Sequence, residues 1–131
     1  MPHRRASFGR AAMTLAGQLI LILEDEPIVG LALEDMIEDA GGRSVSAERI
    51  EEALELVAAE PLDAAILDIN IHGRQSYPVA AALAARGVTY IFATGYGDTL
   101  HPADFADVPT VAKPYSFAEI EKALERAATR R

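Results

Sequence analysis

The stretch LILILEDEPIVG, residues 19–30, joins five consecutive apolar residues to three consecutive carboxylates and a proline. A continuous apolar run of this length is typical of a strand that is buried on both faces. Glu24, Asp25 and Glu26 then lie together at the end of that strand, where their mutual repulsion costs free energy unless a positive charge lies nearby. The stretch therefore predicts a buried strand that leads into an acidic, cation-binding site.

The whole chain has the length and composition of one globular domain. It has 131 residues, of which 50% are hydrophobic, and this is enough to bury a core without covalent cross-links. The absence of cysteine excludes a disulfide framework and cysteine-based metal sites, and it agrees with a cytoplasmic location. The net charge of −8 disfavours binding to nucleic acid, because an acidic surface repels phosphates.

The N-terminal residues differ from the rest of the chain. Arg4, Arg5 and Arg10 make this end basic, but the apolar run that follows is short and leads into acidic residues. This pattern fits neither a signal peptide nor a membrane span. We therefore predict a disordered basic leader over residues 1–16 and a single domain over residues 17–131, with no output domain attached.

Downstream of the leader, short apolar runs alternate with helical patterns, as in five consecutive βα units. The first, third and fourth runs are continuously apolar, which favours parallel strands covered by helices on both faces of a sheet. The sequence thus predicts an α/β fold with a doubly wound parallel sheet. The expected strands cover residues 18–23, 43–47, 64–68, 88–93 and 109–112.

Helices are expected between these strands and after the last one. A Ser-x-x-Glu capping box formed by Ser116 and Glu119 marks the start of the final helix. Residues 95–109 contain two glycines and two prolines, which favours only a short helix near residues 99–106. The other helices are expected at about residues 27–40, 50–60 and 78–86, the second of them with Ile50, Ala53, Leu54 and Val57 facing the core.

Polar residues follow four of the expected strands. Glu24 and Asp25 follow the first strand, Asp68 ends the third, Thr94 follows the fourth and Lys113 follows the fifth. Ligands of open parallel sheets bind outside the carboxyl ends of the strands, so we expect these side chains to meet at one edge. Each residue alone has a simpler explanation, since acidic residues can cap a helix and the others can belong to turns.

The chemistry of this residue set points to a divalent cation and a phosphoryl group. Mg²⁺ prefers carboxylate and carbonyl oxygens, whereas zinc is less suited because the chain lacks cysteine and offers only His72 nearby. Asp68 could be both a metal ligand and a nucleophile toward phosphorus. Lys113 can supply opposing positive charge, and the Thr94 hydroxyl can donate to a phosphoryl oxygen.

Four motifs, LILILEDEP, AAILDINIHG, IFATGYGD and VAKPY, occur in this order and resemble the receiver domains of bacterial two-component response regulators. The resemblance covers residues 17–129. It implies a flavodoxin-like fold of five βα units with the strand order 2-1-3-4-5. It also implies that a sensor histidine kinase transfers a phosphoryl group to Asp68, with Thr94 and Lys113 contacting that group and a cis peptide bond between Lys113 and Pro114.

The same resemblance implies a magnesium site. Its ligands would be Asp25, Asp68 and the backbone carbonyl of Asn70, while Glu24 would act mainly through a bound water. Glu24 stands where most receivers have aspartate, and its longer side chain can still reach such a water.

Residues 92–96, FATGY, are similar to the motif of the "FAT GUY" receivers, mostly stand-alone proteins of alphaproteobacteria, whose partners tend to be histidine kinases of the HWE or HisKA2 type. Typical receivers have an aromatic switch residue three positions before the lysine, but Thr110 stands there. Tyr96 could take over this role or only cover the site. His72 stands where many receivers have proline, and it could tune the phosphate lifetime or be a solvated loop residue.

Three functions are compatible with these residues. The first is a phosphorylation switch that signals through a protein partner or a phosphorelay. The second is a receiver-like binding module that acts without phosphorylation. The third is a small phosphatase with an aspartyl intermediate, such as the haloacid dehalogenase group; against it, Asn70 stands where those proteins have a second acid, and the chain has no room for a cap domain. We therefore expect a signalling protein and not an enzyme.

Overall fold

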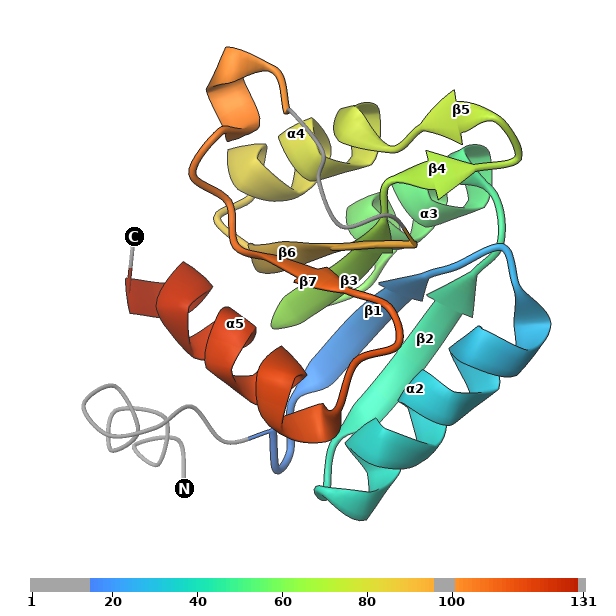
Figure 1. Ribbon diagram of the computed structural model, residues 1–131, viewed down its shortest axis with the longest axis vertical. Coiled ribbons are helices and arrows are strands. Elements are labelled where there is room, and N and C mark those ends of the chain that lie inside the picture. Colours follow the sequence, from blue (N-terminus) through green and yellow to red (C-terminus); the bar gives the residue numbers. More distant parts are fainter. Residues whose placement is uncertain (1–14, 96–100, 130–131) are drawn as a thin grey trace.

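The computed structural model describes residues 15–95 and 101–129. Its centre is a parallel sheet with the strand order β2-β1-β3-β6-β7, which is the predicted order 2-1-3-4-5 when the five strands are counted along the chain (Figure 1). The predicted flavodoxin-like α/β fold is therefore confirmed. The strands of this sheet are β1 (Leu19–Leu23), β2 (Arg43–Ala47), β3 (Ala64–Asp68), β6 (Thr89–Thr94) and β7 (Thr110–Ala112).

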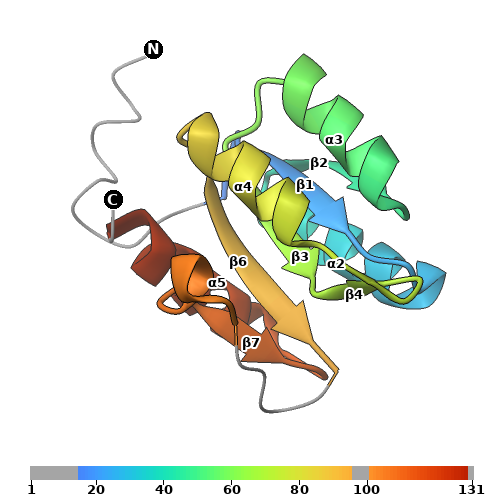
Figure 2. The same ribbon diagram turned by 90° about the horizontal axis from the view of Figure 1, so that it is seen from above.

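Helices cover both faces of the sheet (Figure 2). Helices α2 (Pro27–Asp39) and α5 (Phe117–Thr129) pack on one face, and α3 (Ile50–Ala59) and α4 (Tyr77–Ala85) pack on the other. Alternate residues of β1 supply the two cores: Ile20 and Ile22 face α2 and α5, whereas Leu21 and Leu23 face α3 and α4. This double burial explains why β1 is apolar at every position.

One helix differs in detail from the prediction, and the start of another agrees with it. Leu54 of α3 was predicted to face the core, but it is 37% exposed, while Ile50, Ala53 and Val57 are buried as expected. Helix α3 packs Leu56, and not Leu54, against the core that Ile50, Ala53 and Val57 help to form, so the prediction for Leu54 was wrong. The Ser116–Glu119 capping box is confirmed, because the amide of Glu119 donates to Ser116 Oγ at 3.2 Å and the amide of Ser116 donates to Glu119 Oε1 at 2.9 Å.

The segment after β6 is less helical than expected. Residues 99 and 100 of the predicted short helix lie outside the described residues. Within residues 101–106 the chain forms only one turn of 3₁₀ helix, η1 (Ala103–Phe105), because Pro102 and Pro109 flank it and few apolar residues repeat with helical spacing.

Two further features were not predicted. A small antiparallel hairpin, β4 (Asn70–Ile71) and β5 (Arg74–Gln75), lies between β3 and α4. Leu15, within the predicted leader, is only 1% exposed and packs in the core next to α2 and α5, so ordered structure begins before residue 17. Residues 1–14 of the leader lie outside the described residues.

Within the described ranges, no helix is both long and apolar enough to cross a membrane.

Candidate functional site

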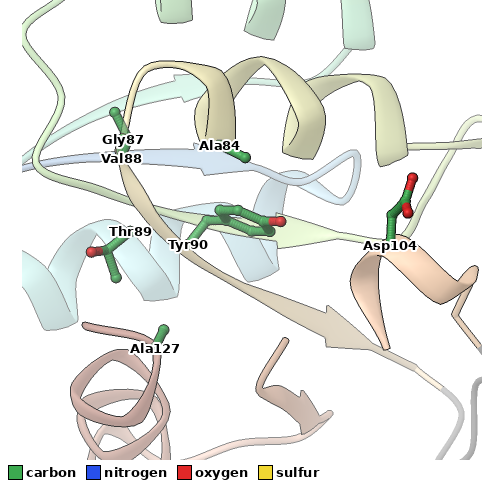
Figure 3. Close-up of a pocket in the computed structure, with 7 residues that line it drawn as sticks. All are labelled: Ala84, Gly87, Val88, Thr89, Tyr90, Asp104 and Ala127. Carbon is green, nitrogen blue, oxygen red and sulfur yellow. The ribbon is translucent and has the colours of Figure 1, made fainter. Parts of the chain in front are cut away.

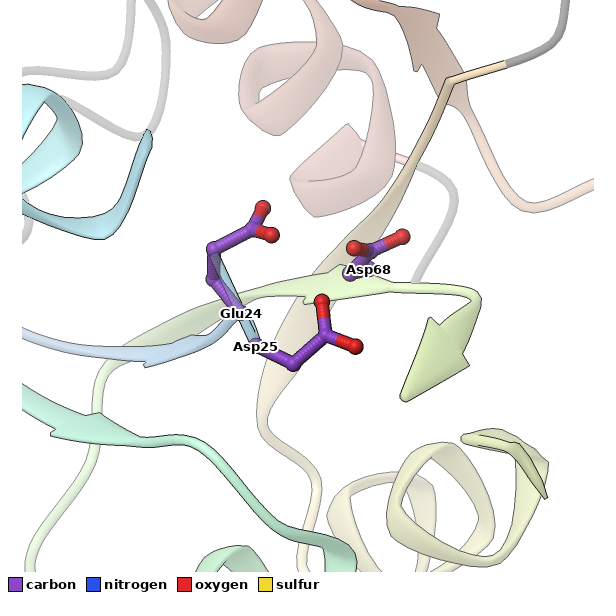
Figure 4. A group of neighbouring side chains, drawn as sticks. All are labelled: Glu24, Asp25 and Asp68. Atoms are coloured by element: carbon purple, nitrogen blue, oxygen red, sulfur yellow. The ribbon is translucent and has the colours of Figure 1, made fainter. Parts of the chain in front are cut away.

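Three carboxylates converge at the carboxyl edge of the sheet, as the sequence predicted (Figure 4). Glu24 and Asp25 follow β1, and Asp68 is the last residue of the neighbouring strand β3. One oxygen from each of the three side chains lies within 4.8 Å of the others. The side chains of Glu24 and Asp68 are 2% and 8% exposed, so two of these acids are almost completely removed from water.

The positive charge that the acidic run requires comes from Lys113, which follows β7. Its Nζ atom lies 3.0 Å from Glu24 Oε1, 3.0 Å from Asp68 Oδ2 and 3.5 Å from Glu26 Oε1. The backbone amide of Lys113 donates to the carbonyl oxygen of Thr94 at 2.8 Å, so the end of β6 holds the lysine in place. One ammonium group thus neutralises part of the charge of several carboxylates.

Burial makes the negative charge of Glu24 unfavourable. Burial raises the pKa of Glu24 to about 7, and repulsion from Asp68 acts in the same direction, while the hydrogen bond from Lys113 only partly opposes them. Burial alone would lower the pKa of Lys113, but its hydrogen bonds to Glu24 and Asp68 outweigh that effect and hold this pKa above its usual range. The site therefore has an excess of negative charge that a single lysine does not balance.

A cleft of about 290 Å³ opens at this group. Thr94 and Asn70 line it together with Asp25, Asp68 and Lys113, so the structure brings every predicted site residue except Glu24 to the wall of one cleft. Glu24 does not line the cleft, but its Oε1 atom lies 3.0 Å from Lys113 Nζ. A second hollow, of about 250 Å³, is bordered by Gly87, Thr89 and Ala127 near the opposite end of β6 (Figure 3). Among the described residues that line this hollow, Asp104 is the only one with a carboxylate, so the cleft at the carboxyl edge is the better candidate for ionic chemistry.

The hairpin β4–β5 supports two of the acidic residues. Ser76, which is completely buried, donates from Oγ to the backbone carbonyl of Asp68 at 2.7 Å. The backbone amide of His72 donates to Asp25 Oδ2 at 2.9 Å. Neither contact was foreseen; glycine at position 73, which favours a turn, was the available sequence signal.

The simpler explanations of the acidic residues do not account for these contacts. Glu26 occupies the N-cap position of α2 but makes no side-chain capping hydrogen bond. The carboxylate of Glu24 accepts the amide of Glu26 at 3.1 Å and at the same time contacts Lys113, so it belongs to the site and not to a cap. The predicted cis peptide bond between Lys113 and Pro114 is confirmed.

Thr110, at the position of the missing aromatic residue, is part of a hydrogen-bond chain. Its Oγ1 donates to the carbonyl of Val108 at 3.2 Å and lies 2.9 Å from His101 Nε2, and His101 Nδ1 lies 2.9 Å from the hydroxyl of Tyr77. Because the Thr110 hydroxyl already donates to Val108, His101 Nε2 carries the proton and Nδ1 accepts from Tyr77. Tyr96, which was expected either to take over the role of the aromatic switch or only to cover the site, lies outside the described residues.

Comparison with known proteins identifies the class that this fold and site define. Residues 20–125 match the response regulator receiver domain family, and the chain therefore belongs to that family. Members of this family receive phosphoryl groups from sensor histidine kinases and are generally signalling modules and not enzymes.

Individual relatives agree with this assignment. The solution structure of SdrG from Sphingomonas melonis Fr1 has 38% sequence identity and a TM-score of 0.75, with 89% of this chain and 99% of SdrG covered. The receiver domain of the sensor histidine kinase PA1611 from Pseudomonas aeruginosa PAO1 has 25% identity and a TM-score of 0.70 over 87% of this chain and 99% of that one, and its active-site cleft contains a coordinated magnesium ion.

A curated relative shows the same relationship at the level of sequence. The sensory transduction protein LytR of Staphylococcus haemolyticus (strain JCSC1435) is 30% identical over 111 residues, which are 81% of this chain and 43% of LytR. The chain thus spans less than half the length of this relative.

The residues at the carboxyl edge fit a divalent cation of the magnesium type. All the side chains that converge there as ligands are carboxylates, and hard oxygen ligands are those that Mg²⁺ prefers. The excess negative charge around Glu24 and Asp68 is a second reason for the fit, because a bound cation would relieve it.

Proposed function

We propose that the protein accepts a phosphoryl group from a sensor histidine kinase on Asp68, in the presence of Mg²⁺, and signals by phosphorylation-dependent protein–protein interaction or phosphorelay. The observation that carries this proposal is the position of Asp68: its carboxylate ends a central strand, borders an open cleft, and lies 3.0 Å from the ammonium of Lys113 and close to two further acids. A nucleophilic carboxylate needs this combination of access and charge neutralisation.

The proposed metal ligands are Asp25, Asp68 and the backbone carbonyl of Asn70, with Glu24 acting through a water. Bound Mg²⁺ supplies positive charge that neutralises the phosphoryl oxygens. An Asp68 carboxylate oxygen attacks the phosphorus of a phosphohistidine, the new O–P bond forms, and the P–N bond to the imidazole breaks. Because this reaction requires mainly positioning and charge neutralisation, no further acid or base is needed on this chain.

Lys113 and Thr94 act on the product. Lys113 already contacts Asp68 and is held in its charged form. It can therefore pair with an oxygen of a phosphoryl group on Asp68 from its present position. Thr94 lines the same cleft, and its hydroxyl donates to a second phosphoryl oxygen. These contacts draw the end of β6 toward Asp68 and alter the surface near β7 and α5, which is the change that a downstream protein reads.

The partner kinase is proposed to be of the HWE or HisKA2 type, because residues 92–96 match the FAT GUY motif. The mode of coupling is proposed to differ from that of receivers with an aromatic switch, because Thr110 is tied to His101 and carries no ring. Tyr96 remains the proposed substitute.

Phosphorylation can be tested with acetyl phosphate and with a panel of histidine kinases of the source organism. Wild-type protein is expected to gain one phosphoryl group in a Mg²⁺-dependent and hydroxylamine-sensitive manner, as measured by intact-protein mass spectrometry. Asp68→Asn should gain none, whereas Asp35→Asn, which changes an exposed aspartate of α2, should behave like wild type. Equal labelling of Asp68→Asn would refute the assignment of the acceptor.

Binding of beryllofluoride distinguishes a phosphorylation switch from a binding module that acts without phosphorylation. A phosphorylation switch should bind it only when Mg²⁺ is present, with amide shifts at Thr94 and Lys113 in nuclear magnetic resonance spectra. A protein that binds neither beryllofluoride nor phosphate but still captures its partner would be a phosphorylation-independent binding module.

A further inference from the structure

The turn of the β4–β5 hairpin holds a histidine in an unusual backbone conformation. The hairpin pairs Asn70 with Gln75 and Ile71 with Arg74, and its turn consists of His72 and Gly73. Both turn residues are left-handed, with φ angles of 51° and 81°. Glycine adopts this conformation freely, but for a residue with a Cβ atom it costs about 1 kcal/mol or more. His72 is the only non-glycine residue with positive φ among residues 15–95 and 101–129.

This conformation directs the backbone amide of His72 to the acidic site. The amide donates to Asp25 Oδ2 at 2.9 Å, across 47 positions of sequence. Asp25 is the most exposed of the three clustered acids, with 21% of its side chain accessible, and Lys113 contacts the other two. In the described part of the chain, the amide of His72 is the only hydrogen-bond donor to the Asp25 carboxylate. This hydrogen bond restrains the orientation of the Asp25 carboxylate.

The hairpin that carries the amide is itself well anchored. Ile71 is 1% exposed and packs in the core beside α3 and α4. Arg74 forms an ion pair with Glu51 of α3 at 2.6 Å. The backbone amide of Ser76, directly after the hairpin, donates to the carbonyl of Ile69 at 2.9 Å. These contacts connect the hairpin to the core and to α3.

We propose that residue 72 is a positioning residue of the metal site: its left-handed backbone, and not its imidazole, orients Asp25 toward the bound cation. This inference rests on the proposed function in taking Asp25 as a metal ligand. The imidazole is a poor candidate for the same role, because 57% of the His72 side chain is exposed and its Nδ1 atom is 4.0 Å from Asp25 Oδ2. The amide donates to Asp25 Oδ2, which would leave the second oxygen of this carboxylate for the cation.

A substitution series at position 72 separates backbone from side chain. His72→Gly and His72→Asn keep the amide and tolerate positive φ, whereas His72→Val keeps the amide but strongly disfavours this conformation. We expect Kd for Mg²⁺, measured by calorimetry at fixed pH, to stay within about twofold of wild type for the Gly and Asn variants and to rise about tenfold for Val. In metal-free protein, hydrogen exchange of the residue 72 amide should be faster in the Val variant only.

A control variant distinguishes this effect from a general weakening of the hairpin. Gly73→Ala strains the neighbouring turn position, where φ is 81°, but leaves the amide of His72 in place. It is expected to lower stability in urea unfolding while changing Kd for Mg²⁺ by less than about threefold. If Gly73→Ala weakens Mg²⁺ binding as much as His72→Val, the effect belongs to the fold of the hairpin and the proposal is wrong.

Two other results would overturn the proposal. Weak Mg²⁺ binding by both the Gly and Asn variants would assign the role to the imidazole, and wild-type affinity in the Val variant would show that the amide is dispensable. Neither result depends on phosphorylation, so both differ from a failure of the proposed function, which would appear as intact Mg²⁺ binding without labelling of Asp68. Wild-type protein that binds no Mg²⁺ would overturn both the inference and the Mg²⁺ dependence of the proposed function, whereas labelling of Asp68 tests the phosphoryl acceptor separately.

Discussion

Glu24→Gln should make the metal-free protein more stable, although it removes a residue of the site. The Glu24 side chain is 2% exposed, and Lys113, its only cationic neighbour among residues 15–95 and 101–129, is shared with Asp68 and Glu26. Glutamine has nearly the same shape, keeps an oxygen that accepts from Lys113, and carries no charge. The substitution therefore removes the cost of a buried carboxylate with little change in packing.

The size of the effect follows from the pKa of Glu24, which burial raises from 4.5 to about 7. The folded protein then holds this proton more tightly than the unfolded chain does, so stability falls as the pH rises from 4.5 through 7 and is constant above that range. A shift of this size corresponds to a cost of about 3 kcal/mol at pH 8 and about 1 kcal/mol at pH 5.5. Glutamine removes both costs.

Urea unfolding followed by circular dichroism in the presence of a chelator can measure this difference. Glu24→Gln is expected to exceed wild type by about 3 kcal/mol at pH 8 and by about 1 kcal/mol at pH 5.5. Glu26→Gln is the matched control, because the Glu26 side chain is 64% exposed and its removal should change stability by less than about 0.5 kcal/mol. A gain for Glu24→Gln that is equal at the two pH values, or a loss at pH 8, would refute the reasoning. Added Mg²⁺ should stabilise wild type more than the variant.

Three further outcomes are expected. Gly42→Ala should lower the free energy of unfolding by about 1 to 3 kcal/mol in urea, because the new Cβ atom would lie 2.8 Å from the carbonyl oxygen of Leu15. Ser76→Ala should cost about 1 to 3 kcal/mol in the same assay, since it leaves the buried carbonyl of Asp68 without the donor at 2.7 Å. Burial lowers the pKa of His101 below 6.5, so wild-type protein loses stability as the pH falls below 6.5 and His101 must bind a proton. His101→Gln should therefore be less sensitive to acid than wild type, and melting temperatures measured from pH 7.5 to 5 test this.

Matched variants serve as controls for the first two of these substitutions. Gly95→Ala adds a Cβ atom with no other heavy atom within 4 Å, and Ser46→Ala removes an exposed hydroxyl from β2. Both should stay within about 0.5 kcal/mol of wild type. Losses for Gly42→Ala and Ser76→Ala that are no larger than those of their controls would contradict the roles of close packing and of the buried hydrogen bond. A His101→Gln melting profile parallel to that of wild type would contradict the argument for His101.

The acidic edge of the sheet illustrates how a binding site reduces the stability of the empty protein. Glu24 and Asp68 are both buried and share one ammonium, an arrangement that burial makes unfavourable until another positive charge arrives. The same excess charge that destabilises the metal-free fold would attract a dication to the proposed metal site. The lower stability of the metal-free protein and the proposed metal binding therefore have the same cause, which is the buried carboxylates.

Much of this organisation follows from local sequence. The runs at residues 19–23 and 64–68 contain hydrophobic side chains at nearly every position, and only a strand with two covered faces buries all of them. Once the strands are parallel, their carboxyl ends share an edge, so the residue that ends each strand is placed near the others by topology alone. This is why Asp25, Asp68 and Lys113 could be assigned to one site from the sequence.

Other features depended on contacts that no local pattern encodes. The exposure of Leu54 was decided by how α3 rests on the sheet, and the burial of Leu15 by the space that α2 and α5 leave beside β1. The hydrogen bond from His72 to Asp25 joins residues 47 positions apart and depends on a hairpin of two-residue strands, too short for any periodicity to appear. Hydrophobic spacing determines which segments are buried, whereas the partner of each polar group depends on the register and packing of distant segments, which only the tertiary structure decides.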